Sequence, residues 1–152
     1  MKDEFKIFLN NLKDTEKLAK KIAEVIVPQT LILIRGKMGV GKTTLVRNII
    51  QSLSNRKLIV SSPTFPIVNT YDLKRIRIWH YDLYRLKNKH EIYELDFELA
   101  LMDCTIIEWP EIIEDILPHK RIDILIEEVT PLKRLAKVFQ IGEKSKRLKL
   151  EL

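Results

Sequence analysis

The chain of 152 residues is 45% hydrophobic and 32% charged, with a formal net charge of +6, which indicates a folded globular domain and excludes a disordered chain. A single cysteine, Cys104, excludes an internal disulfide framework and suits a reducing compartment. No apolar run approaches membrane-spanning length, and charges interrupt the segment where a signal peptide would lie, so we expect a cytoplasmic protein without membrane contact.

Hydrophobic periodicity predicts alternating strands and helices along the first part of the chain, and mainly strands toward its end. In chain order we expect a strand at 4–9, a helix at 14–26 with Asp14 or Thr15 as N-cap, a buried strand at 30–34, a helix at 42–53 and a short strand at 58–62. These are followed by a hairpin at 66–86, a helical segment in two pieces at 89–102, a buried strand at 104–109, a short helix at 110–116 and two strands at 121–129 and 135–141.

The charge is unevenly distributed along the chain. Residues 91–115 contain nine acidic residues and no lysine or arginine, whereas residues 133–152 contain seven basic and two acidic residues. The basic end suits RNA or an acidic partner, but a solvated terminus explains it equally well.

The stretch GKMGVGKTT, residues 36–44, matches the phosphate-loop spacing G-x-x-x-x-G-K-S/T and lies between a predicted strand and a predicted helix. Glycines allow backbone N–H groups to approach phosphate oxygens closely, and the following helix directs its positive end at them. We expect Lys42 to reach the β- and γ-phosphates and the Thr43 hydroxyl to bind Mg²⁺. The residues expected to contact the nucleotide here are Met38, Gly39, Val40, Gly41, Lys42, Thr43 and Thr44.

Such a loop needs a second acidic metal ligand, usually at the end of a neighbouring buried strand. Glu108 fits because it follows the apolar run CTII, and parallel sheets bind ligands at the carboxyl ends of their strands. Asp82 is the other candidate, either to orient the attacking water or to hold Mg²⁺ through water. In WHYDLY, residues 79–84, a period of two places His80 on the same strand face as Asp82, and we interpret His80 as a structural hydrogen-bonding residue.

Together these features predict an α/β fold with a P-loop NTPase-like, mostly parallel central sheet, additional antiparallel strands and flanking helices. We expect a single P-loop ATPase domain over residues 1–142. Residues 143–152 would form a basic C-terminal tail, either as a short strand or as a partly disordered segment.

Four stretches, GKMGVGKTT, SSPTF, HYDLYRL and IIEWPE, resemble in their order and spacing the bacterial TsaE family, also called YjeE. The resemblance runs from the first helix to about residue 140. It implies a Mg-dependent ATPase required to make threonylcarbamoyladenosine in tRNA. It also implies two partner proteins, TsaD and TsaB. We expect slow hydrolysis by the chain alone, because a phosphate loop without a positioned charge partner gives weak catalysis. ATP hydrolysis would reset the TsaD–TsaB complex between turnovers. This chain would therefore act on tRNA only indirectly, through that complex.

The resemblance also assigns roles to individual residues. The catalytic residues that it implies are Lys42, Asp82 and Glu108. It implies Thr43 and Glu108 as the Mg²⁺ ligands and places Leu12 on the adenine side of the ATP site. A family arginine near the nucleotide matches Arg134, or Lys133 if the alignment slips by one position.

Other matched positions concern switching and partner contact. Ser62 and Thr64 fall in a family segment that behaves like a switch, although such residues also cap or turn a chain. Trp109 matches a family tryptophan. Its neighbours Glu108 and Pro110 favour a role near the nucleotide or a partner, although bulky aromatic residues after strands usually belong to the core. Arg85 would either stabilise transferred charge, as an arginine finger does, or make a structural or partner-facing salt bridge.

Two positions depart from the family pattern. Lys37 stands where the family usually has an acidic residue, and its side chain should point to solvent. Asp96 replaces a glycine, so the family does not predict the backbone conformation of this segment.

Other functions fit the sequence less well. A small-molecule kinase needs a lid, and no lid segment is obvious in this chain. A GTPase needs the motif N-K-x-D, where residues 88–91 read NKHE. A non-enzymatic RNA-binding module would suit the basic tail, but no aromatic-interleaved RNA motif accompanies it.

Overall fold

The computed structural model describes residues 2–63, 66–143 and 146–150 and folds them around one mixed sheet. The strands are β1 Lys2–Leu9, β2 Leu31–Arg35, β3 Val68–Asp72, β4 Arg77–Asp82, β5 Cys104–Glu108, β6 Arg121–Thr130 and β7 Lys133–Ile141. The α-helices are α1 Leu12–Ala23, α2 Lys42–Leu53 and α3 Phe97–Ala100, and the 3₁₀ helices are η1 Lys89–Leu95 and η2 Pro110–Ile116. In these residues the strand order is β1-β7-β6-β2-β5-β4-β3.

The centre of the sheet is parallel and its edges are antiparallel. Strands β6, β2, β5 and β4 run parallel to one another, whereas β3 pairs with β4, β7 with β6 and β1 with β7 in the antiparallel sense. β2 and β5 are apolar runs that are almost completely buried, because both of their faces are covered. The predicted α/β fold, with a mostly parallel central sheet, added antiparallel strands and flanking helices, is confirmed.

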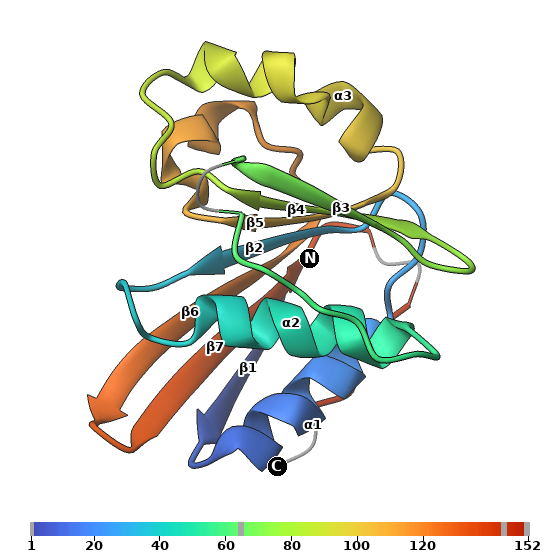
Figure 1. Ribbon diagram of the computed structural model, residues 1–152. Helices are drawn as coiled ribbons and strands as arrows, with labels where there is room; N and C mark the ends of the chain where they lie inside the picture. Colours follow the sequence, from blue (N-terminus) through green and yellow to red (C-terminus); the bar gives the residue numbers. More distant parts are fainter. Residues whose placement is uncertain (1, 64–65, 144–145, 151–152) are drawn as a thin grey trace.

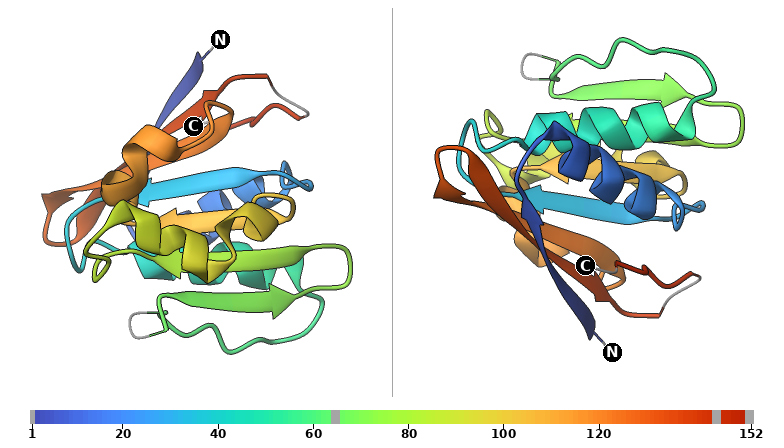
Figure 2. Two further views of the ribbon diagram at one scale, coloured as in Figure 1. Left: turned by 90° about the horizontal axis from the view of Figure 1, so that it is seen from above. Right: turned by 90° about the horizontal axis from the view of Figure 1, so that it is seen from below.

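Helices lie on both faces of the sheet and give three layers (Figures 1 and 2). α1 and α2 cover one face, over a core that includes Ile32, Ile34 and Ile106. η1, α3 and η2 lie on the other face, over a second core that includes Leu33 and Ile107. Successive residues of β2 enter the two cores alternately, as the period of two requires. The carboxyl ends of β2, β4 and β5 therefore lie between packed elements on the two faces of the sheet.

The predicted strand at 58–62 was wrong. This segment has no regular secondary structure, and Ile59 is 91% exposed. Arg47 on α2 donates its Nε–H to the Val60 carbonyl at 3.2 Å. A helix side chain thus provides a hydrogen bond that a neighbouring strand would otherwise supply, and the apolar run lies along α2 instead of joining the sheet.

The helix ends depend on local capping. α1 begins at Leu12 with Asn11 as N-cap, whose side chain accepts the Asp14 N–H at 2.9 Å. The prediction of Asp14 or Thr15 as N-cap was therefore wrong. Asp96 has a φ of 57° and separates η1 from α3, which confirms the helical segment in two pieces. Aspartate is one of the few residues other than glycine that adopt this left-handed conformation readily.

The described part of the tail lies against the domain. The Gln140 side chain donates to the Lys146 carbonyl at 2.7 Å and accepts the Leu148 N–H at 2.9 Å. Leu148 is 4% exposed and packs in the core beneath α1 and α2. Across the described ranges, every helix is too short or too polar to cross a membrane.

Candidate functional site

The loop of residues 36–41 joins β2 to α2 at the carboxyl end of the parallel strands. Gly36 has a φ of 147°, and a Cβ added there would lie 2.6 Å from the Ile126 carbonyl oxygen and 2.8 Å from Val40 Cγ1. Only glycine fits this position without movement of the backbone. The first turn of α2 receives no side-chain cap, so its N–H groups are available to an anion.

The Lys42 side chain folds back over the loop. Its Nζ donates to the carbonyls of Gly36 and Lys37, the latter at 2.9 Å, and lies 4.0 Å from the centroid of the Trp109 ring. Burial lowers the pKa of Lys42, although nearby carboxylates, Glu108 foremost, act to raise it. The ammonium group is thus already largely removed from water before any ligand arrives.

β4 and β5 place two carboxylates side by side, because Asp82 and Glu108 are register partners. Glu108 is 2% exposed; its Oε1 accepts the Thr43 hydroxyl at 2.9 Å, and its Oε2 lies 2.6 Å from His80 Nε2. Asp82 accepts the Tyr84 backbone N–H at 3.0 Å. Burial raises the pKa of Asp82, aided by the charge of Glu108 and opposed by the Tyr84 N–H. Asp82 is therefore a better proton acceptor than an ordinary aspartate.

The pair of Thr43 and Glu108 suits a magnesium ion. A hydroxyl and a carboxylate are the hard oxygen ligands that Mg²⁺ prefers, and their oxygens lie 2.9 Å apart. In the part of the chain that the structure describes, no group of three or more His, Cys, Asp or Glu side chains is arranged to hold a metal. An ion at Thr43 and Glu108 would therefore draw its remaining ligands from nucleotide phosphates and water.

Of the clefts that border the loop, two share Gly39, Gly41 and Thr44. The first, of about 460 Å³, lies between the loop, α1 and the β6–β7 turn, and Leu12 and Leu132 line it. The second, of about 400 Å³, is lined by two carboxylates and a lysine. Its other lining residues are Met38, Lys42, Thr43, Ser62, Asp82, Tyr84, Glu108 and Trp109. The two clefts form one path across the loop, from an end with Leu12 and Leu132 to an end lined by acids and Lys42.

Arg134, rather than Lys133, faces the first cleft. The Arg134 side chain lines it and donates its Nε–H to the Val40 carbonyl at 3.3 Å. Lys133 turns away, with its Nζ 4.2 Å from the centroid of the Phe8 ring. Of these two residues, Arg134 is the one that lines the cleft, and its contact with a nucleotide stays a prediction.

Trp109 links the end of β5 to η2. Its φ of 57° is uncommon for a bulky residue, and Pro110 follows at the first position of η2. The ring centroid lies 5.0 Å from that of Tyr84 and faces Lys42. Trp109 is thus a partly exposed wall of the second cleft, in addition to its contacts with the core.

The remaining predicted residues lie elsewhere. Arg85 is exposed and lines neither cleft, and Thr64 lies outside the described residues. Lys37 is exposed, as expected. Tyr84 and Leu132 were missed: Tyr84 lies within the HYDLYRL stretch, which could have indicated it, whereas Leu132 carries no sequence signal because only the β6–β7 turn brings it to the cleft.

Comparisons with known proteins show which family and which fold the chain resembles. A sequence model of the family described as "Threonylcarbamoyl adenosine biosynthesis protein TsaE" matches residues 9–136. The chain is 40% identical over 140 residues to the tRNA threonylcarbamoyladenosine biosynthesis protein TsaE of Rickettsia felis, a match that covers 91% of this chain and 82% of that protein. It is 30% identical to the protein of the same name from Bacillus subtilis, with 93% and 89% covered. A crystal structure of Bacillus subtilis YdiB is similar with a TM-score of 0.77 and 26% identity, covering 93% of this chain and 88% of that one.

Proposed function

This chain belongs to the TsaE family, and from that premise we propose that it binds and hydrolyses ATP with Mg²⁺ in the threonylcarbamoyladenosine modification of tRNA. Its role in this biosynthesis follows from the family. The proposal adds the reaction, the metal and the partners: hydrolysis on this chain would reset a TsaD–TsaB complex between turnovers.

One observation carries the proposed reaction. Lys42, Thr43, Asp82 and Glu108 all line one cleft at the N-terminus of α2. Backbone N–H groups, a lysine, two carboxylates and a hydroxyl are the groups that phosphoryl transfer to water requires. A site for an uncharged ligand would gain nothing from this set of buried charges.

Each residue would have a distinct task in the reaction. Lys42 would exchange its Gly36 and Lys37 carbonyl partners for phosphate oxygens, at little further cost in hydration because it is already buried. Thr43 and Glu108 would hold Mg²⁺, which when bound neutralises charge on the phosphates. Asp82 would orient the attacking water and accept its proton, and its raised pKa suits this task.

The first cleft would hold the nucleoside. Leu12 is 68% exposed and Leu132 is 86% exposed, so both present apolar surface on which an adenine ring can pack. Arg134 lines the same cleft and would contact the sugar or the phosphates. This assignment leaves the acidic end of the path for the γ-phosphate.

The described residues of the second cleft provide one cation for the transition state. Lys42 alone among them is a lysine or arginine. Phosphoryl-transfer sites without a further positioned charge hydrolyse slowly, and a partner can supply that charge. We therefore propose that the TsaD–TsaB complex activates this chain.

ATP turnover with and without the TsaD–TsaB complex tests the proposal. Lys42→Ala should abolish turnover, because it removes the side chain that would grip the phosphates. Lys37→Ala is the matched control, since it removes an exposed lysine from the same loop and should leave turnover unchanged. Normal hydrolysis by Lys42→Ala would contradict the assigned site, and equal rates with and without the complex would contradict partner activation.

A further inference from the structure

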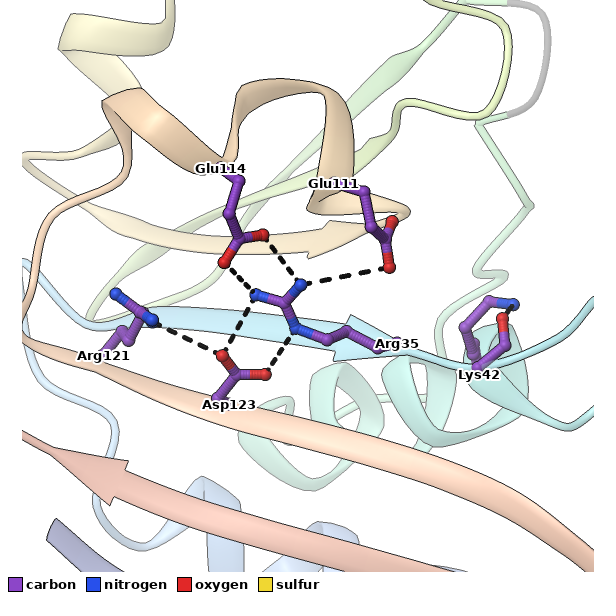
Figure 3. A network of polar contacts seen from close by, with 7 residues as sticks. Arg35, Lys42, Glu111, Glu114, Arg121 and Asp123 are labelled. Atoms are coloured by element: carbon purple, nitrogen blue, oxygen red, sulfur yellow. Dashed lines mark hydrogen bonds and ion pairs between the residues drawn. The ribbon is translucent and has the colours of Figure 1, made fainter.

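Arg35, the last residue of β2, ties three elements together just before the phosphate loop (Figure 3). Its Nη1 and Nη2 donate to the two carboxylate oxygens of Glu114 on η2 at 2.7 and 2.8 Å. Its Nε and Nη2 donate to Asp123 on β6 at 2.7 and 3.1 Å. The planar guanidinium thus holds one carboxylate on each of two edges, a geometry that lysine cannot reproduce. We call this set of three residues the Arg35 clamp.

The clamp is electrostatically tight. Glu111 lies 4.0 Å from Arg35 and Arg121 lies 3.4 Å from Asp123, so three carboxylates surround two guanidinium groups. The Arg35 side chain is 19% exposed. Burial alone would lower the pKa of Arg35, but its hydrogen bonds to Glu114 and Asp123 raise it above the ordinary value. Without Arg35, Arg121 would be the remaining guanidinium group beside the three carboxylates, and their negative charges would repel one another.

The clamp is also connected to the candidate site at both ends. Arg35 directly precedes Gly36, whose carbonyl accepts a hydrogen bond from Lys42. Glu114 lies on η2, the short helix that starts just after Trp109, whose ring lies over Lys42. The floor of the phosphate loop and the aromatic wall above Lys42 are therefore joined through a single guanidinium group.

η2 has little internal structure to hold it in place. It is a 3₁₀ helix, a form with poorer hydrogen-bond geometry than an α-helix, and Ile113 within it departs from helical geometry. Its first residue follows Trp109, whose left-handed backbone persists only where the surroundings impose it. External contacts must fix η2. They include the buried side chains of Pro110 and Ile113, the partly buried Ile112 and Ile116 on the second core, and the clamp. The ion pair of Asp115 with Lys89 is exposed and adds little.

We propose that Arg35 is a positioning residue that acts through Glu114 on η2 and so holds the Trp109 ring over Lys42. The inference rests on the proposed function, because it assigns the clamp an effect on ATP turnover. It differs from a purely structural role in one respect: loosening η2 displaces Trp109 and lowers the rate of the chemical step while the rest of the fold persists.

The test compares three variants of the full chain. Glu114→Gln weakens the link to η2 and leaves Arg35 paired with Asp123, so the chain should fold. Arg35→Lys keeps the positive charge but loses the two-edged contact. Asp115→Asn is the matched control, because it removes the neighbouring exposed ion pair on the same helix. Proteins labelled with fluorotryptophan are examined by fluorine NMR without nucleotide. The chain has two tryptophans, so Trp79 serves as the internal reference.

Glu114→Gln and Arg35→Lys should shift or broaden the Trp109 resonance and leave the Trp79 resonance unchanged. Both variants should lower kcat about tenfold, because small misplacements of catalytic groups have effects of that order or larger. KM for ATP should change less than kcat, and Asp115→Asn should match the wild type in every respect. A Trp109 resonance or a kcat identical to wild type in Glu114→Gln would overturn the proposal, whatever the change in Tm.

The two readouts separate this inference from the proposed function. An absence of ATP turnover in the wild type would refute the proposed function. The fluorine resonance, measured without nucleotide, would still decide whether the clamp positions Trp109.

Discussion

Substitution of Gly36 by alanine tests the closest packing in the phosphate loop. The backbone φ of 147° lies in a region that is essentially restricted to glycine. A Cβ would also approach the Ile126 carbonyl oxygen to 2.6 Å and Val40 Cγ1 to 2.8 Å. The first neighbour is backbone of β6 and cannot rotate away, so the loop would have to move.

The size of the effect follows from two terms. Backbone strain of this kind costs about 1–3 kcal/mol, and overpacking of a rigid site costs about 1–3 kcal/mol. We therefore expect Gly36→Ala to lower the free energy of unfolding by about 4 kcal/mol. In a domain of this size that loss corresponds to a fall in Tm of roughly 8–16 °C. ATP affinity should also fall, because the displaced loop no longer aims its N–H groups at one point.

Gly39→Ala is the matched control in the same loop. Its φ of 78° is also positive, but no atom would lie within 4 Å of an added Cβ. Only backbone strain applies, at about 1–2 kcal/mol. Urea denaturation and thermal unfolding of both variants provide the comparison. Equal losses of stability in the two variants would refute the steric part of the reasoning, since both share the positive φ and differ in their neighbours.

Two further predictions concern turnover and affinity. Asp82→Asn should still bind ATP but hydrolyse it at least about tenfold more slowly. Because protonation would disable Asp82, wild-type turnover should fall as the pH drops through the raised Asp82 pKa. This acidic limb of the pH–rate profile should be absent in the variant. A variant with the wild-type rate and profile would remove Asp82 from the reaction. Arg134→Gln should weaken binding of a fluorescent ATP analogue by about tenfold, which is the effect of one lost charge-assisted hydrogen bond. Lys133→Gln should leave this affinity unchanged, because Lys133 faces Phe8. Similar affinities for the two variants would contradict the placement of the Arg134 side chain in the nucleotide cleft.

The errors in the sequence reading have a common physical origin. The run LIVSS has the composition of a strand, but strand formation requires a partner edge, and α2 supplies Arg47 to the Val60 carbonyl instead. The N-cap of α1 is Asn11, which precedes the apolar periodicity by several residues and therefore leaves no mark on it.

The candidate site was predicted more completely than the surroundings that position it. Lys42 and Thr43 lie next to one another in a contiguous motif, and period two along β4 placed His80 with Asp82, as the contact of His80 with Glu108 bears out. The roles of these residues in ATP turnover stay predictions. The contributions of Leu132 and Tyr84 to the clefts appear only once the β6–β7 turn and the end of β4 lie beside the loop.

The sequence by itself determined which residues form the candidate phosphate loop, because a loop that wraps phosphate is a local structure whose glycines, lysine and threonine must be neighbours in the chain. Only the tertiary structure decided which distant groups meet that loop. Asp82 and Glu108 come together through the register of β4 and β5, and Arg35 bonds Glu114 and Asp123, which lie 79 and 88 positions away. Such contacts depend on how separate segments pack, and hydrophobic periodicity within each segment carries no record of its partner across the sheet.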